Sequence, residues 1–588
     1  RGPASVLHGA KAIGGVVNII TKRGAAKPVQ AEIGGTYYSG TDGWQGWAAA
    51  SGTVGDFDYR ISGSLDDHGD RRVPNGQYTS TGRLDGTSFG NDNLSAHLGY
   101  TFGDAGNHYI ALKAMQHRLW TENWTDWSAL EYPVVGFNID LPKRDLRRIG
   151  LQYDGTDISD IVRKVHVDAY YQTIDRVFSN QILMQPSSVV TVQVDSTSDD
   201  RIFNYGGTAQ ADLQFHPDHQ TIVGVNYLTD NLRAAKTSTM TSIRLIPPNP
   251  PIINITPSSS FDDASIHTIS AFAQNEWSFA ENFKLTTGAR YYHTNVVHDY
   301  AEEDSVVVPT HPSKSDGKLV TSAGLTYTGI ENTTLRALYS EGYITPTLLQ
   351  LFTDTSAGSG EITYANANLA PETSRNIEIG ARYNAGNLAL DGAAFYTRAR
   401  NYITTLNCSV VACPGGSTSV QSMYVNADSA TSYGVELAAE YAVPGTGFTP
   451  YLTGTWMRRQ VVLNGVFGTM QTYDTNTPAL SGRLGLRWEG EVAEHDFWAD
   501  LYVRAATGVT QTTWATRRPP YVSGFVTRTL PAWGTLNLAF GGSFGGEDDD
   551  KFRYGVHFNN ILNKEYRSSF DEIPGVGRSV EVSLRMKF

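Results

Sequence analysis

Two cysteines are the first residues whose chemistry can be judged from spacing. Cys408 and Cys413 are the only cysteines among 588 residues, and they lie five positions apart in a polar segment next to proline and glycine. No Cys/His pattern with zinc-binding spacing accompanies them, so a zinc site is not indicated. A disulfide that closes a small loop in an oxidising compartment fits best, with two free thiols as the alternative.

Catalytic spacings are missing from the rest of the sequence. We find no H-E-x-x-H metal motif and no glycine-rich loop that would cradle a phosphate. The acidic run at 547–550 could attract calcium, but a solvated turn is the expected interpretation. The sequence therefore predicts a protein that is not an enzyme, with no cofactor and no metal.

Composition limits how the chain can fold. It contains 58 glycines, 31 tyrosines and 11 tryptophans, and its mean hydropathy is −0.30. No stretch of about 18 apolar residues is available to cross a bilayer as a helix. A membrane β-barrel is compatible with this polar average, because its strands alternate apolar residues toward lipid with polar residues toward the lumen. The formal net charge of −13 argues against nucleic acid as a partner.

The alternation that a barrel requires is clearest at the C-terminus. Between residues 580 and 588, apolar side chains occupy every even position, and Glu581, Ser583, Arg585 and Lys587 occupy the odd ones. A period of two over about ten residues is what a membrane-crossing strand needs, although a soluble sandwich would show it too. The same alternation recurs at 165–172, 283–291, 377–383 and 433–441.

Short and long connections alternate along the chain. Brief turns such as 55–56, 104–106 and 280–282 separate long polar segments, which include 117–145, 175–200 and 234–264. Outer-membrane barrels have this asymmetry between their periplasmic and outer ends. Counting strands from residue 28 gives about 22, a size at which the lumen is plugged. The predicted fold is all-β, a transmembrane antiparallel barrel, with the proline-rich run 247–251 inside one loop.

The chain opens with a dense motif, RGPASVLHGAKAIGGVVNIITKRG. Its paired glycines permit a tight turn, and residues 16–20 would form a short buried strand. This segment resembles the end of the plug domain in TonB-dependent outer-membrane receptors. Segments 339–380 and 559–588 resemble the central and C-terminal blocks of the same family, so the resemblance spans essentially the whole chain.

The resemblance implies a lock between plug and wall. In the family, plug arginines pair with two glutamates on inward barrel faces, and the matching positions here are Arg1, Glu378 and Glu436. The alternation agrees, because both glutamates occupy lumen-facing positions. A carboxylate there is solvated in an empty barrel but needs a cation once a plug fills it. The alternative is that both are ordinary lumenal charges.

The resemblance also implies partners and a missing part. Energy would arrive through TonB, ExbB and ExbD of the inner membrane, and the family's plug is much longer and follows a TonB box that offers a strand to TonB. We expect residues 1–27 to be the C-terminal end of the plug domain and 28–588 to be the barrel. A signal peptide, the TonB box and most of the plug would precede residue 1.

The cargo is only broadly constrained. The family's commonest cargo is a ferric siderophore, and loops that offer arginine and aromatic rings suit such polyoxygenated, often anionic ligands. Haem is less favoured, because residues 347–365 lack the histidine that the family's haem receptors carry there, while cobalamin and oligosaccharides stay open. Interfacial anchoring or loop packing is the alternative for every candidate contact. The candidates are Arg118, Trp120, Trp124 and Trp127 in one loop, Tyr343 and Tyr364 in a second, and Trp514, Arg517, Arg518 and Tyr521 in a third.

The leading functional hypothesis is TonB-coupled active uptake of a scarce nutrient by a monomer in the Gram-negative outer membrane, in contact with lipid and lipopolysaccharide. A passive, plugless pore is the second hypothesis. An attachment protein for adhesion, phage or bacteriocin, whose long loops are the functional part, is the third.

Overall fold

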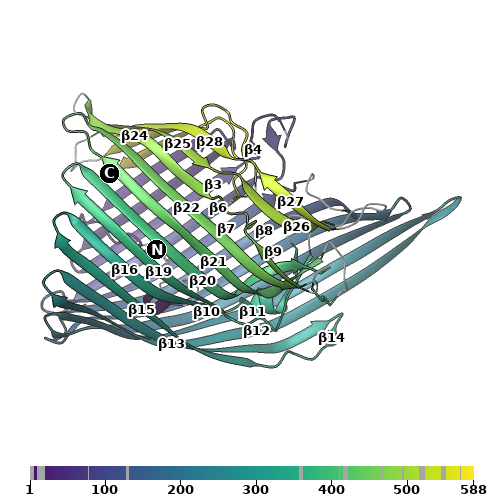
Figure 1. Cartoon of the computed structure of the whole chain (residues 1–588), viewed down its shortest axis with the longest axis horizontal. Helices are drawn as coiled ribbons and strands as arrows, with labels where there is room; N and C mark the ends of the chain where they lie inside the picture. The colour runs from purple at the N-terminus through teal and green to yellow at the C-terminus, as the bar shows by residue number, and fades with distance from the viewer. Residues whose placement is uncertain are drawn as a thin grey trace.

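One antiparallel sheet closes on itself in the computed structural model, which describes residues 5–9, 20–76, 78–126, 132–356, 362–408, 411–414, 421–465, 468–492, 495–515, 524–544, 551–569, 571 and 573–588. Closure occurs because β1 (Gln30–Tyr38) pairs with β2 (Gly43–Val54) on one side and with β30 (Ser579–Lys587) on the other. The strands run obliquely around a hollow cylinder (Figure 1).

Twenty-two strands form the staves of this cylinder in the described part of the chain, as the alternation predicts. Each stave is antiparallel to the next, and nearly all follow one another in chain order. After β1 and β2, and before β30, the staves are β3 (Phe57–His68), β6 (Phe89–Phe102), β7 (His108–Asn123), β8 (Val134–Thr156), β9 (Val162–Ser187), β10 (Val190–His216), β11 (His219–Ile246), β12 (Asn249–Ala280), β13 (Phe283–Glu303), β15 (Lys314–Ile330), β16 (Thr333–Ile344), β19 (Glu372–Ala385), β20 (Leu388–Asn407), β21 (Gln421–Tyr441), β22 (Phe448–Gly465), β24 (Leu480–Val492), β25 (His495–Ala506), β28 (Trp533–Phe544) and β29 (Phe552–Asn559).

Small elements decorate the staves. The short helices are α1 (Ser5–His8) and α2 (Leu348–Phe352), and no helix among the described residues is long and apolar enough to cross a bilayer. The short strands are β4 (Arg71–Arg72), β5 (Arg83–Leu84), β14 (Val306–Val307), β17 (Thr355–Ser356), β18 (Ile362–Tyr364), β23 (Gly468–Thr472), β26 (Val509–Ala515) and β27 (Gly524–Leu530).

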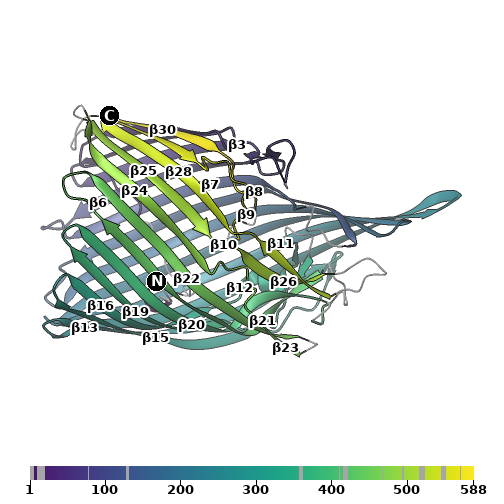
Figure 2. The same ribbon diagram turned by 45° about the horizontal axis from the view of Figure 1, so that its top comes forward.

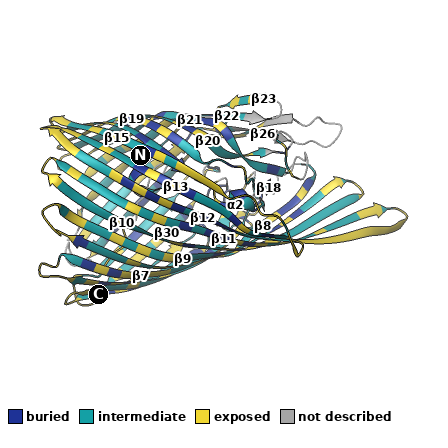
Figure 3. Ribbon diagram, turned by 90° about the horizontal axis from the view of Figure 1, so that it is seen from below, coloured by how far each residue is buried: buried dark blue, intermediate teal, exposed yellow. Residues whose placement is uncertain are grey.

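The outer face of the staves is apolar, as the period-two pattern requires. On β19, Ile377 and Ile379 are 57% and 60% exposed, whereas Asn376 and Glu378 between and beside them are buried. The banding of buried and exposed residues along each stave follows this alternation (Figure 3). Exposed aliphatic side chains at this density belong against hydrocarbon, and the polar positions therefore line the bore.

Strands β8 to β12 extend far beyond the height of the other staves (Figures 1 and 2). They contain 23 to 32 residues each, whereas about 9–11 residues suffice to cross a bilayer. The prediction of long loops at 175–200 and 234–264 is therefore wrong, because both segments are hairpins with two-residue turns at 188–189 and 247–248. Outside the membrane both faces of a strand meet water, so the apolar alternation disappears while the backbone pairing continues.

The proline-rich run 247–251 also differs from expectation. Pro247 and Pro248 form the hairpin turn, and the remaining residues begin β12. Pairing between β12 and β13 starts only at Ser260, so residues 249–259 form an edge strand. Proline is tolerated on an edge because no ladder hydrogen bond is needed there.

The connection between β16 and β19 packs on the wall through α2. Thr347 caps α2, with its hydroxyl accepting from the amide of Gln350. Leu348 of α2 then joins a buried cluster with Leu232, Ala234, Ala264 and Ile266 on the inner face of β11 and β12. This inward connection lines part of the bore.

Candidate functional site

Helix α1 sits inside the barrel against the inner faces of β12, β13, β15 and β16, and we call this contact the seat. Val6 is 4% exposed and packs among Tyr292, Val320 and Tyr343, which are all buried. Gly9 ends the helix with a φ of +89°, a conformation that suits glycine. The final motif of the predicted plug is therefore anchored in an apolar pocket of the wall.

Arg290 of β13 holds the other side of α1. Its Nη1 donates to the backbone oxygens of Val6 and Leu7 at 3.3 and 3.4 Å, and its Nε and Nη2 donate to Ser270 Oγ at 3.1 and 2.7 Å. The guanidinium carbon lies 4.9 Å from the ring centre of Phe272 and 5.0 Å from that of Tyr292. The residue is 3% exposed. The seat thus clamps the end of α1 through carbonyl groups.

A second contact, the linker anchor, fixes residues 23–28 against β2, β3, β7 and β8. The amide of Gly24 donates to Asp58 Oδ1 at 3.1 Å, and the amide of Thr53 donates to the Lys27 carbonyl at 3.0 Å. The Arg23 guanidinium lies 4.2 Å from the centre of the Tyr109 ring and 3.9 Å from Asp154 Oδ2. Carboxylates dominate this anchor, in contrast to the seat.

Only the wall side of the predicted plug-to-wall lock lies among the described residues. Glu378 and Glu436 both lie on inward positions of β19 and β21, and Glu378 is 5% exposed. Arg336 Nε lies 3.4 Å from Glu378 Oε1, so a wall arginine already partners that carboxylate. Arg1 is outside the described residues. The pairing of Arg1 with these glutamates stays a prediction.

The predicted ligand residues of the first loop separate into two groups. Arg118 and Trp120 were expected in a loop, but β7 continues to Asn123 and carries both. They share the outward face with Ile110 and Leu112, and Arg118 pairs with Asp92 at 2.9 Å. Side chains that alternate along a strand cannot turn back to the lumen, so these two positions do not face the bore.

The other predicted ligand residues are also scattered. Tyr343 is not a loop residue: it lies in β16, is 1% exposed, and donates a hydrogen bond to Asp316 Oδ2 at 2.8 Å within the seat. Tyr364 lies in β18, which pairs in parallel with β21, and Trp514 lies in β26. Trp127, Arg517, Arg518 and Tyr521 fall outside the described residues.

Trp124 reaches a cavity at the outer end of the bore, where the first and last staves meet. This seam cavity has a volume of about 530 Å³. Two arginines line it, Arg71 and Arg504, together with two glutamates, Glu122 and Glu581, and with aromatic rings that include Tyr502 and Tyr566. Burial lowers the pKa of Arg71, against the opposing effect of the Asp571 carboxylate, and burial raises the pKa of the Tyr566 phenol. A partly desolvated guanidinium beside aromatic rings suits an anionic, ring-bearing ligand.

Three loops meet beside the seam cavity at a single carboxylate, and we call this contact the clasp. Asp126 Oδ2 accepts from Arg528 Nη2 at 2.7 Å and from Arg567 Nη1 at 2.5 Å. Arg567 is 7% exposed, and its guanidinium carbon lies 5.3 Å from the Trp124 ring centre and 5.9 Å from that of Tyr78. The clasp therefore joins the β5, β7, β27 and β29 sides of the mouth.

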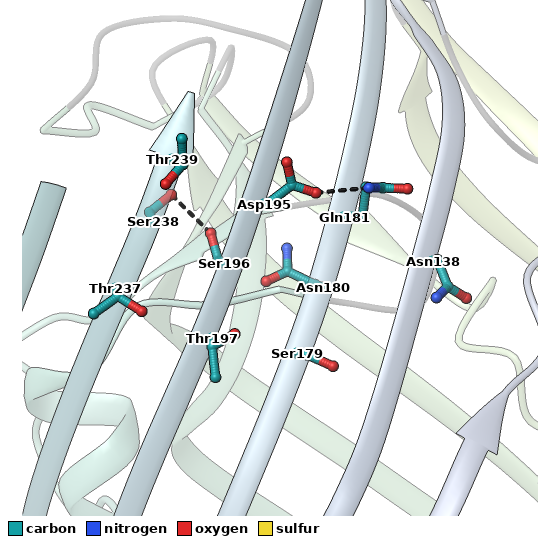
Figure 4. A pocket seen from close by; sticks show the side chains of 10 residues that line it. All are labelled: Asn138, Ser179, Asn180, Gln181, Asp195, Ser196, Thr197, Thr237, Ser238 and Thr239. Carbon is teal, nitrogen blue, oxygen red and sulfur yellow. Dashed lines mark hydrogen bonds between the residues drawn. The ribbon is translucent and has the colours of Figure 1, made fainter. Parts of the chain in front are cut away.

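A hollow of about 340 Å³ lies on the wall of the extended strands. Ten polar side chains from β8 to β11 line it, and Figure 4 shows the hydrogen bonds from Gln181 to Asp195 and between Ser196 and Ser238. Gln181 and Asp195 share the parity of the outward-facing Tyr171 and Tyr205. This hollow therefore opens mainly on the outer surface and not into the bore.

Further chemistry of the described residues is limited. No group of three or more His, Cys, Asp or Glu side chains in that part of the chain is arranged to hold a metal ion. Cys408 and Cys413 are joined by a disulfide, with Cα atoms 5.5 Å apart.

Sequence reasoning missed the most buried arginines of the site. Arg290 lies on a predicted strand at a lumen-facing position, and that parity was the available signal. Arg567 and Arg71 gave no local signal, because their partners are distant in sequence.

Comparison with known proteins agrees with this architecture. A family model described as "TonB dependent receptor-like, beta-barrel" matches residues 28–561. The iron-regulated outer membrane virulence protein of two Vibrio cholerae strains is 32% identical over 169 residues. That alignment covers 28% of this chain and only 23% of the relative.

Solved structures cover nearly the whole chain. The copper transporter OprC has a TM-score of 0.72 at 16% identity, covering 100% of this chain and 85% of that one. The FrpB iron transporter of Neisseria meningitidis has 0.70 at 17%, covering 96% and 82%. The ferric yersiniabactin uptake receptor FyuA of Yersinia pestis has 0.67 at 16%, covering 100% and 84%. At these identities the likeness establishes the fold alone.

Proposed function

Because this chain belongs to the TonB-dependent receptor family, whose barrels are integral to the outer membrane, we propose that it imports a scarce nutrient by active transport, with a ferric siderophore as the cargo. The observation that carries this proposal is the seat. A segment of the N-terminal motif lies inside the bore, held by Val6 and Arg290, and in this proposal the passage of cargo requires that segment to move.

The seam cavity supports the choice of cargo. It opens at the outer end of the bore, and it offers Arg71 and Arg504 together with aromatic rings. Arg504 also lies over the Trp533 ring, 5.5 Å from its centre, and Trp533 packs against Tyr566 at 4.9 Å between ring centres. Arginine side chains that lie over aromatic rings can bind ligands that are both anionic and aromatic, as many iron chelates are.

Coupling to energy belongs to the same proposal. TonB, with ExbB and ExbD, would act on the segment that precedes the seat, and the proposed domains are 1–27 for the end of the plug and 28–588 for the barrel. The proposed lock between Arg1, Glu378 and Glu436 would be one of the contacts to break. We propose a monomer surrounded by outer-membrane lipid and lipopolysaccharide.

Uptake in cells tests this proposal. A strain that lacks the gene is grown on a panel of radiolabelled ferric chelates, with and without the gene restored. We expect restored uptake of at least one chelate, and loss of that uptake when TonB is deleted. Uptake that persists without TonB would reject active transport, and no restored uptake of any ferric chelate would reject the cargo class.

A further inference from the structure

Arg290 is a buried cation without a carboxylate partner anywhere in the described chain. Its hydrogen bonds end on Ser270 and on the carbonyls of Val6 and Leu7, and no ion pair to it is found among those residues. Other lumenal arginines differ: Arg585 pairs with Glu32 at 3.0 Å, and Arg483 pairs with Asp500 at 2.6 Å. A buried charge without a countercharge is unfavourable, so Arg290 keeps an unsatisfied attraction for anions.

Residues 1–31 do not supply the missing charge. The first acidic residue of the whole chain is Glu32, so residues 1–31 contain no carboxylate side chain. They do contain Arg1, Lys11, Lys22, Arg23 and Lys27. Among the described contacts, Arg290 therefore meets the partial negative charge of two carbonyl oxygens and of the Ser270 hydroxyl, and no carboxylate.

We propose that Arg290, with Phe272 and Tyr292, is a binding site for an anionic, ring-bearing group, covered by α1 when the plug is seated and exposed when α1 leaves. The site rests on the proposed function, since it lies on the path of a cargo through the bore. Arginine binds a carboxylate through two parallel hydrogen bonds. The two rings beside the guanidinium offer faces against which an aromatic ligand stacks.

A substitution at Gly288 can test whether α1 leaves the seat. The fit of α1 depends on Gly288, because a Cβ there would lie 2.8 Å from Val6 Cγ1 and 3.0 Å from Ser322 Oγ. The wall around Gly288 is a paired sheet, whereas α1 is four residues long. A larger residue at 288 should therefore displace α1 and leave the wall in place.

The experiment opens the seat in the full chain by Gly288→Val. Val6→Cys reports the opening, because the native cysteines are joined in a disulfide and the introduced thiol is the only one. We expect that thiol to resist maleimide in Val6→Cys and to react in Val6→Cys/Gly288→Val. If it stays protected, Gly288→Phe replaces Gly288→Val. Protection in both variants would overturn the proposal, because the site would then never be uncovered.

Benzoate is the probe, and benzamide, with the same ring and no charge, is its control. By calorimetry in detergent, we expect benzoate to bind the opened protein at least tenfold more tightly than wild type, with no such gain for benzamide. The gain should be lost at least tenfold in Gly288→Val/Arg290→Gln. It should persist in Gly288→Val/Arg585→Gln, because the Arg585 charge is already matched by Glu32.

Benzoate binding that ignores Arg290→Gln, or an exposed thiol without benzoate binding, would overturn the proposal. The result is separable from the proposed function. Failed uptake of ferric chelates in cells, with benzoate binding intact, would reject the cargo and leave the anion site standing. Intact uptake without benzoate binding would reject the site alone.

Discussion

Two arginines in this barrel hold other segments in place, and they do so with different chemistry. Arg290 at the seat and Arg567 at the clasp are 3% and 7% exposed. Each stands against two aromatic rings, Phe272 and Tyr292 for the first and Trp124 and Tyr78 for the second. Arg567 bonds to the carboxylate of Asp126, whereas Arg290 bonds to a hydroxyl and two carbonyls.

This difference indicates which of the two contacts, the seat or the clasp, separates more easily. Breaking a buried ion pair leaves two exposed or unmatched charges, so the clasp resists separation. Releasing α1 from Arg290 exchanges weak, long hydrogen bonds for water or an anion. The mouth is therefore expected to stay assembled around the seam cavity while the seat gives way.

Removing the shared carboxylate should have the largest effect. Asp126→Ala leaves Arg528 and the buried Arg567 facing each other, and we expect the clasp to lose about 3–5 kcal/mol. Hydrogen exchange of residues 560–578 measures this as faster opening, and residues 5–9 serve as the internal control. Unchanged hydrogen exchange of residues 560–578 would show that the clasp contributes no measurable free energy to keeping the mouth assembled.

A matched pair of substitutions addresses the comparison directly. Arg567→Met should loosen the mouth by about 1–3 kcal/mol, because Asp126 loses a buried partner. Arg290→Met should change the exchange of α1 by less than about 1 kcal/mol, because an apolar side chain of similar size replaces an unmatched charge. Equal effects at the two sites would abolish the distinction between seat and clasp.

The outer arginine of the clasp should matter less. Arg528 is 39% exposed, so its bond to Asp126 competes with water. Arg528→Gln should weaken the clasp by no more than about 1 kcal/mol. The measurement is hydrogen exchange of the β27 amides, with the β28 amides as the reference. A loss of clasp stability as large as that caused by Asp126→Ala would contradict this ranking.

Acidification should loosen the β4–β5 hairpin, the mouth element that carries Tyr78 to Arg567. Hydrogen bonds from Arg72 and Arg83 hold the pKa of Asp42 below its usual value. A depressed pKa stabilises the docked hairpin above the unfolded value of about 4, and that stabilisation is lost as pH falls through the lower folded value. The protection of residues 71–84, taken relative to the intrinsic amide exchange rate at each pH, should therefore fall below pH 4 in wild type but not in Asp42→Asn, and constant protection in wild type would refute this.

The sequence by itself determined the barrel. Side-chain direction along a strand is a local property, so the alternation at 377–379 and 580–588 already assigned Ile377 to lipid and Glu378 to the bore. It could not mark where strands continue into water, because both faces are then polar. Segments 175–200 and 234–264 were for that reason taken as loops.

Only the tertiary structure decided the site. Arg290 and Val6 lie 284 positions apart in the sequence, and Asp126 and Arg567 lie 441 positions apart. The local sequence around each of these residues therefore does not indicate its partner. Closure of the sheet through β1 and β30 brings Asp126 and Arg567 together, and packing of α1 inside the barrel brings Val6 to Arg290. The structure also shows that Arg118 and Trp120 lie on β7 and point outward, whereas Tyr343 lies on β16 and points inward. The sequence had assigned all three residues to loops, where alternation predicts no direction.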